Sequence, residues 1–173
     1  MSLELSLRLR RPLSAGLMLA VVGGAAGLWP DQSAVAAGPF QPFIGEWTGG
    51  GQITGSNGTR ERIRCRANYV EARRGEALAQ TIVCASPSYR LEIQSSVEAS
   101  GQSVQGSWQE TTRNVSGQVT GTIQGGRFVG AVSGAGFTAQ LSLRSNGRRQ
   151  SVNIQPSAGD IADVQIELER RRG

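Results

Sequence analysis

Residues 115–134 read VSGQVTGTIQGGRFVGAVSG, and this stretch shows most clearly which fold the chain adopts. Apolar residues and glycines alternate with polar residues up to Ile123, Gly125-Gly126 follows, and the alternation resumes at Phe128. A period of two indicates a β-strand with one buried face. Two glycines between two such runs indicate a hairpin with a two-residue turn. This turn sets Ile123 opposite Phe128, so that apolar residues meet on one face.

The same pattern, an alternating run followed by a turn, continues through most of the chain. The expected strands are residues 45–53, 59–70, 77–86, 88–98, 103–111, 114–123, 127–134, 136–145, 149–155 and 163–170. They predict an all-β fold, an antiparallel up-and-down meander of about ten strands that closes into a barrel. The alternative is a flattened β-sandwich. Because about eight strands already make a filled barrel, a wider one lined by small side chains leaves a cavity.

The turn residues also predict the register of other hairpins. The expected opposite pairs are Val97 with Val104 around Ser100-Gly101, Leu141 with Val152 around Asn146-Gly147, and Ile53 with Ile63 around Ser56-Asn57-Gly58. In each pair an apolar residue faces another, as a half-buried sheet requires. Residues 39–43, which precede the first strand, are expected to run extended onto the barrel mouth.

The chain has two cysteines, Cys65 and Cys84. A hairpin that turns at Arg74-Gly75 places them directly opposite each other on the same face, at a spacing that suits a disulfide. Reactive thiols and a metal site are the alternatives. They would need a thiol of low pKa or further ligands, for which the sequence offers no pattern. We therefore expect a structural disulfide.

Residues 1–37 have the pattern of a signal peptide. Arg8, Arg10 and Arg11 form a positive region, an apolar stretch runs over residues 13–29, and residues 35–37 are a small-residue cleavage site. Cleavage after residue 36 and an uncleaved anchor are the alternatives. The remaining residues, 38–173, form a single β-barrel domain without a membrane span. We expect the mature protein in the periplasm or secreted, where a disulfide can persist.

The composition excludes several kinds of chemistry. The chain has no His, the commonest general base and metal ligand, so Ser-His triads are ruled out and no metal site is expected. For haem, only Tyr69 or Tyr89 remains as an axial ligand, and either is more often a core aromatic. Glu61 and Glu110 are the best acid candidates, near the barrel ends, where a carboxylate paired with Arg is the expected alternative. We expect no enzyme, no catalytic residue and no cofactor.

Four arginines alternate along the second expected strand: Arg60, Arg62, Arg64 and Arg66, called the arginine stripe below. They project from one face, opposite the apolar one. The functional interpretation is a binding stripe for phosphate, lipopolysaccharide or an acidic polymer. The alternative is a solvated face that protects the sheet from aggregation. Nucleic acid is not expected as a partner, because no outward aromatic residues alternate with these arginines.

Gly45-Glu46-Trp47 opens the first strand and resembles the Gly-x-Trp motif of the lipocalin and wider calycin group, which includes nitrobindin-like barrels. The resemblance implies that Trp47 packs across the barrel floor under an Arg near the last strand, here Arg170. Nitrobindin-like barrels bind haem through a His, which this chain lacks, so haem binding is not carried over. The chain is also similar to uncharacterised exported alphaproteobacterial proteins, a likeness that includes Arg64-Cys65-Arg66 and brings no activity.

These features predict an exported, calycin-like barrel that binds a small apolar or amphipathic ligand. The expected pocket residues are Trp47, Tyr69, Tyr89, Ile93, Trp108, Phe128 and Phe137. The same residues would also suit a filled core. The alternative function is an envelope-associated interaction module whose arginine stripe binds anionic surfaces or partners. A third interpretation, an outer-membrane barrel with apolar faces outward, lacks the aromatic girdles of that class.

Overall fold

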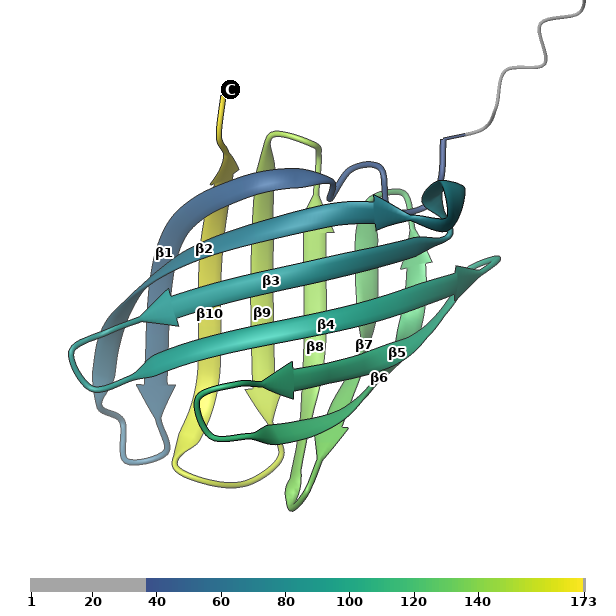
Figure 1. The fold of residues 1–173 in the computed structure, drawn as a ribbon. Helices are drawn as coiled ribbons and strands as arrows, with labels where there is room; N and C mark the ends of the chain where they lie inside the picture. The colour runs from purple at the N-terminus through teal and green to yellow at the C-terminus, as the bar shows by residue number, and fades with distance from the viewer. Residues whose placement is uncertain (1–36, 173) are drawn as a thin grey trace, which may run out of the picture. The chain divides into compact units, whose positions relative to one another are not determined.

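The computed structural model describes residues 37–172, and these form a closed antiparallel barrel (Figure 1). Its strands are β1 (Gly45–Gly55), β2 (Arg60–Ala72), β3 (Ala77–Ala85), β4 (Arg90–Ser100), β5 (Ser103–Glu110), β6 (Val115–Gln124), β7 (Arg127–Gly134), β8 (Phe137–Ser145), β9 (Arg149–Pro156) and β10 (Ile161–Arg170). Each strand pairs with the next along the chain, and β10 pairs with β1. The predicted barrel is therefore confirmed, and the flattened sandwich is not formed.

Residues 1–36 of the predicted signal peptide lie outside the described residues. Within residues 37–172, no helix has both the length and the apolar character that a membrane crossing requires.

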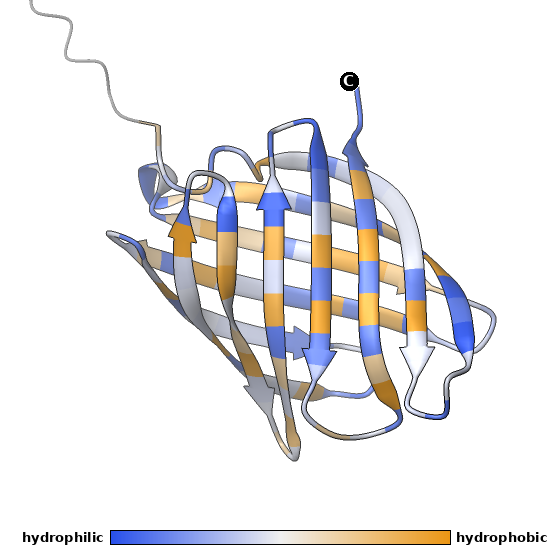
Figure 2. Cartoon of the chain, turned by 180° about the vertical axis from the view of Figure 1, so that it is seen from behind, coloured by the Kyte–Doolittle hydropathy of each residue, from blue (hydrophilic) through white to orange (hydrophobic). Residues whose placement is uncertain are grey.

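Side chains of opposite character lie on opposite faces of the sheet. Figure 2 shows hydrophilic and hydrophobic residues alternating along the strands. On β2 the inward residues Ile63, Cys65 and Tyr69 are buried, whereas the outward Arg64 and Arg66 between them are exposed. The apolar face is thus inside the barrel, which is the reverse of the arrangement expected for an outer-membrane barrel.

The register predicted around Gly125-Gly126 is confirmed, with Ile123 opposite Phe128. Both glycines have positive φ, +56° and +75°, as a type I′ turn requires. The other three predicted registers are wrong by two residues. The observed pairs are Val97 with Gly106, Leu141 with Ile154, and Ile53 with Glu61.

The position of glycine within the turn explains two of these differences. Gly101 and Gly147, with φ of +59° and +81°, stand first of the two central turn residues, not second. A type II′ turn places glycine there. In the β1–β2 hairpin, residues 56–58 form the loop as predicted, but the loop joins Gly55 to Thr59 and so sets Ile53 two residues away from Ile63. A displacement of two leaves every side chain on its predicted face.

The segment before β1 closes one end of the barrel. It was expected to be extended, but it forms consecutive turns, with hydrogen bonds from Gln41 N to Gly38 O and from Phe43 N to Phe40 O. Phe40 and Phe43 are each only 3% exposed, because the turns direct both rings into the barrel. Ser145 Oγ on β8 donates a hydrogen bond to the Pro42 carbonyl and attaches the segment to the far wall.

Trp47 lies beneath this segment, and the role implied for it by the calycin resemblance agrees with its position. Its side chain is 1% exposed, and its Nε1 donates to the Phe43 carbonyl at 2.7 Å. The Arg170 guanidinium lies 5.4 Å from the Trp47 ring centroid and also donates to the Ile44 carbonyl. This cation–π contact joins the first strand to the last. Gly45 has φ +119°, and a Cβ there would lie 3.3 Å from Arg170 Nε.

Cys65 on β2 and Cys84 on β3 are paired in register and form a disulfide, as predicted. Both residues are nearly fully buried, and both line the interior. The bond fixes two neighbouring strands that are already hydrogen-bonded, so its main effect is on the unfolded chain. In the chain-entropy model, closing a loop of this length contributes about 3 kcal/mol.

We predict that replacing both cysteines (Cys65→Ala with Cys84→Ala) lowers the free energy of unfolding by about 3 kcal/mol without changing the fold. Urea denaturation of the oxidised wild type and the double variant measures the difference. Alkylation of the unreduced wild type under denaturing conditions should add no group. Two alkyl groups per chain would contradict the disulfide.

Candidate ligand cavity

The barrel interior contains a cavity of about 520 Å³, lined almost entirely by apolar side chains from all parts of the sheet. Six of the seven predicted pocket residues line it: Tyr69, Tyr89, Ile93, Trp108, Phe128 and Phe137. Trp47 does not. It lies in the floor, where the ring is covered by the segment before β1.

The cavity is closed at the floor and accessible toward the opposite end. Inward residues near the floor, such as Leu78, Val97 and Val104, are at most 4% exposed. Inward residues farther along the same strands, such as Ile82 and Leu91, are only half-buried. Because these side chains point inward, their exposed surface faces the cavity. Two lining residues in the loops at that end, Tyr89 of the β3–β4 loop and Arg113 of the β5–β6 loop, are also exposed on the surface, so the cavity is accessible from this end.

Phe40 and Phe43 line the cavity from below, and sequence reasoning missed them. They belong to no alternating run, since their segment consists of turns around two prolines. The only signal was the presence of two aromatic residues in a chain that has few.

Three inward glycines of β6 and β7 lie against aromatic rings. A Cβ on Gly121 or Gly130 would lie within 2.8 Å of the Phe128 ring, and one on Gly134 would lie 3.0 Å from Trp108. Trp108 also donates from Nε1 to the Ser133 carbonyl. The volume that these glycines release is thus filled by Phe128 and Trp108, and the cavity lies beyond the two rings.

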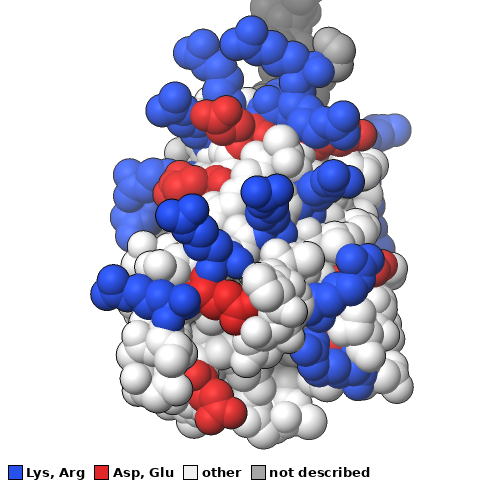
Figure 3. All heavy atoms as spheres, turned by 90° about the vertical axis from the view of Figure 1, so that its left-hand side faces the viewer, with Lys and Arg blue, Asp and Glu red and all other residues white. Residues whose placement is uncertain are grey.

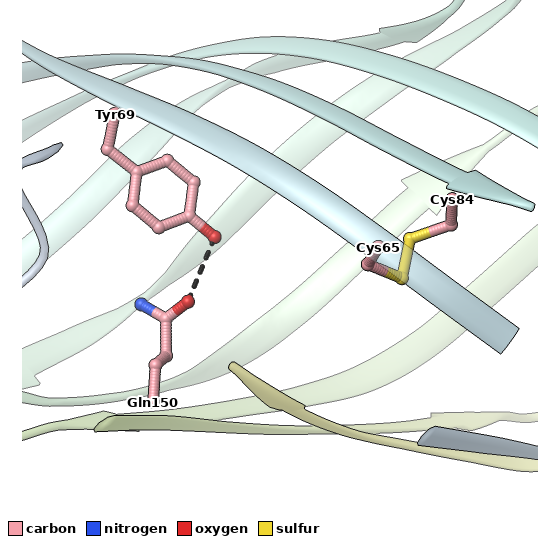
Figure 4. Close-up of a disulfide and its surroundings, with 4 residues drawn as sticks. All are labelled: Cys65, Tyr69, Cys84 and Gln150. Atoms are coloured by element: carbon pink, nitrogen blue, oxygen red, sulfur yellow. Dashed lines mark hydrogen bonds between the residues drawn. A yellow bond between two sulfur atoms is a disulfide. The ribbon is translucent and has the colours of Figure 1, made fainter. Parts of the chain in front are cut away.

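Tyr69 and Gln150 meet inside the barrel from β2 and β9 (Figure 4). The Tyr69 hydroxyl donates to Gln150 Oε1 at 3.1 Å. Burial raises the pKa of Tyr69, so the phenol stays protonated and the donor direction is fixed. Gln150 is fully buried, and its Nε2 has no hydrogen-bond partner among the described residues. The alternation along β9 places Gln150 inward, but its pairing with Tyr69 could not be read from the sequence.

The two acid candidates hold loops at the mouth. The Glu61 carboxylate accepts from Ser88 N at 2.8 Å, and hydrogen bonds from Ser86 and Ser88 lower the pKa of Glu61. Glu110 is 4% exposed and accepts from the backbone N–H groups of Glu92, Thr112 and Arg113.

Burial alone would raise the pKa of Glu110, but these hydrogen bonds and one from the Thr112 hydroxyl outweigh it and lower the pKa to about 2. The Arg113 guanidinium lies 3.7 Å from the Glu110 carboxylate, the rim pairing expected from the sequence. The Glu110 carboxylate is therefore ionised at neutral pH and its oxygens are engaged in shaping the β5–β6 loop.

The arginine stripe lies on the outer face of β2. Arg60, Arg62, Arg64 and Arg66 are all exposed, and none of them forms an ion pair within residues 37–172. Their register neighbours on β1 and β3 are uncharged: Thr48, Gly50, Gln52, Thr54, Val83 and Ala85. Figure 3 shows arginine side chains over much of this side of the barrel, with fewer acidic ones between them.

The described residues form a closed ten-stranded antiparallel barrel around a cavity, and solved structures of similar fold are known. The crystal structure of Rv2717c from M. tuberculosis is similar, with a TM-score of 0.63 and 15% identity, over 79% of this chain and 99% of that one. The S-type phycobiliprotein lyase CPES from Guillardia theta is also similar, with a TM-score of 0.53 and 11% identity, over 78% and 91% of the two chains.

At these identities the likeness concerns the fold alone. No family model matches the chain, and no curated protein matches it. The likeness to exported alphaproteobacterial proteins therefore gains no sequence support from the comparisons.

We predict that Glu110→Gln lowers the free energy of unfolding at pH 7 by about 2 kcal/mol, because buried N–H groups lose a charged acceptor. Since folding lowers the Glu110 pKa, the carboxylate stabilises the fold above pH 4.5, and this contribution is lost as the pH falls toward 2. The difference between wild type and variant should therefore shrink over that range in urea titrations. Glu167→Gln, an exposed change on β10, is the control. An equal effect of both variants would contradict the role of Glu110.

Proposed function

We propose that this protein is an exported carrier that binds a small apolar or amphipathic molecule inside its barrel. One observation carries the proposal: a cavity of about 520 Å³, apolar on nearly all sides and accessible from one end. Ligand cavities in proteins span about 300–1,000 Å³ and are mainly apolar with a few polar groups. Transfer of apolar surface from water into such a site contributes about 25 cal/mol per Å².

An amphipathic ligand fits the polarity of the two ends. The floor is sealed by Phe40, Phe43 and Trp47, whereas the mouth carries Tyr89 and Arg113. A molecule whose apolar part occupies the interior can leave a polar end near these mouth residues. The buried disulfide supports the periplasm or the exterior of the cell as the site of action.

Binding is favoured over catalysis by the state of the two acids. Glu61 and Glu110 each accept backbone hydrogen bonds from mouth loops, and both have lowered pKa values. A general acid needs a raised pKa and a free approach to substrate. We therefore propose that the mouth carboxylates have a structural role.

A second function is favoured by the arginine stripe. Within residues 37–172 its four exposed guanidinium groups have no acidic partner, and their register neighbours on β1 and β3 are uncharged. An anionic envelope component would therefore meet no carboxylate paired with the stripe. In this alternative the barrel is an interaction module, and its outer face carries the activity.

For the carrier, native mass spectrometry of protein purified from its own host should show a reproducible non-covalent adduct. A neutral fluorescent probe, N-phenyl-1-naphthylamine, should bind the emptied protein and be displaced by the extracted adduct. Bare protein that also fails to bind the probe would contradict the carrier function.

We predict that Val132→Trp, an inward change on β7 that fills the cavity, weakens probe binding at least tenfold. Val129→Trp is the matched control, because Val129 is on the same strand but 39% exposed on the outer face. Probe fluorescence titrations with both variants measure the effect. Equal affinities would place the probe outside the barrel.

For the alternative, we predict that Arg62→Ala with Arg64→Ala weakens binding to vesicles of anionic lipid several-fold at low salt. Wild-type binding should fall as salt rises, since exposed charges are screened. The control is Arg127→Ala with Arg144→Ala, which removes the same charge from β7 and β8. If both double variants bind alike, only net charge matters, and the stripe is not a specific site.

A further inference from the structure

The apolar cavity wall carries one row of polar side chains. Tyr69, Gln80 and Ser95 are register partners on β2, β3 and β4, so they form a row at one level across three neighbouring strands. All three line the cavity. They lie between apolar inward residues, Ile82 on one side of Gln80 and Leu78 on the other. This row is called the polar band below.

Several hydrogen-bond donors and acceptors of the polar band have no partner within residues 37–172. The side chains of Gln80 and Ser95 are half-buried and form no hydrogen bond with any residue in the range 37–172. Gln80 offers two donors and an acceptor, and Ser95 offers a hydroxyl. The Tyr69 hydroxyl donates its hydrogen bond to Gln150, so the Tyr69 oxygen can still accept a hydrogen bond from another group. Polar groups that face an apolar enclosure are normally satisfied by a partner, here water or a ligand.

The band itself contains no charged side chain, and Glu110 lies one inward position beyond Trp108, the register partner of Ser95. The charged residues that line the cavity are Glu110 and Arg113, which lie 3.7 Å from each other at the mouth. Because Glu110 and Arg113 are engaged with each other, an ionic group at the level of Gln80 and Ser95 would leave water without a free counter-ion, which is unfavourable. An uncharged carbonyl or hydroxyl can instead accept from Gln80 and exchange a hydrogen bond with Ser95.

We propose that the cavity ligand is an apolar molecule with an uncharged carbonyl or hydroxyl group, seated against Gln80 and Ser95 inside the barrel. The inference rests on the proposed carrier function and names the chemical class of its ligand. A polar group on the ligand replaces the hydrogen bonds of the water it displaces, whereas a hydrocarbon leaves Gln80 and Ser95 without partners.

A matched pair of ring compounds tests this ligand class. Cyclododecanone and cyclododecane differ by one carbonyl, and both can be titrated as competitors of N-phenyl-1-naphthylamine. In the double variant Gln80→Leu with Ser95→Ala, affinity for the ketone should fall about tenfold relative to wild type, the effect of losing one to two hydrogen bonds. Affinity for the hydrocarbon should stay equal or rise. Comparing each ligand with itself removes the difference in aqueous solubility.

The matched control is Gln94→Leu with Ser96→Ala, which makes the same two changes on β4 on exposed outward positions. It should leave both affinities unchanged. The carbonyl stretching frequency of cyclododecanone bound to the wild type gives a second measurement that needs no variant. It should be lower than in an alkane solvent, as expected for an accepted hydrogen bond.

The outcomes separate the two proposals. If neither the probe nor either ring binds the wild type, the carrier function itself is wrong. If both rings bind, but the inward variant leaves ketone affinity unchanged and the carbonyl frequency equals that in alkane, the carrier function stands and the polar band is not a ligand site.

Discussion

Closure of the hydrogen-bonded ring between β1 and β10 is the constraint on which the rest of the structure depends. Once the sheet is closed, every strand has two neighbours, and the alternation of side chains defines an inside and an outside. The inside is wider than its own side chains can fill. The cavity, the polar band and the outward arginine stripe all follow from this one geometric condition.

Much of this arrangement could be predicted, because it depends on local patterns. Whether a residue stands at an odd or an even position of its strand decides which face its side chain occupies, as for Ile63 and Arg64. A two-residue error in register does not change this face. The register of the hairpins was harder to predict from the sequence. The dipeptides Ser100-Gly101 and Asn146-Gly147 are compatible with glycine in either central turn position, and the sequence does not say which.

The features that sequence reasoning missed depend on contacts between distant segments. Phe40 and Phe43 close the floor from a segment without periodicity, and Tyr69 reaches Gln150 across 81 residues of sequence. The contact between Trp47 and Arg170 was available only through the family resemblance, since nothing local to either residue points to the other. The alternation along β3 places Gln80 inward, but that its amide has no protein partner among the described residues became evident only with its neighbours in position.

The contact between Trp47 and Arg170, where the first strand meets the last, affects the order in which the chain folds. Its two sides come from opposite ends of the barrel sequence, so the loop-closure entropy of almost the whole domain opposes its formation. Hairpins such as β6–β7 can form early, because their residues are close in sequence. We therefore expect the floor to be sealed late in folding, with the apolar interior open at both ends until then.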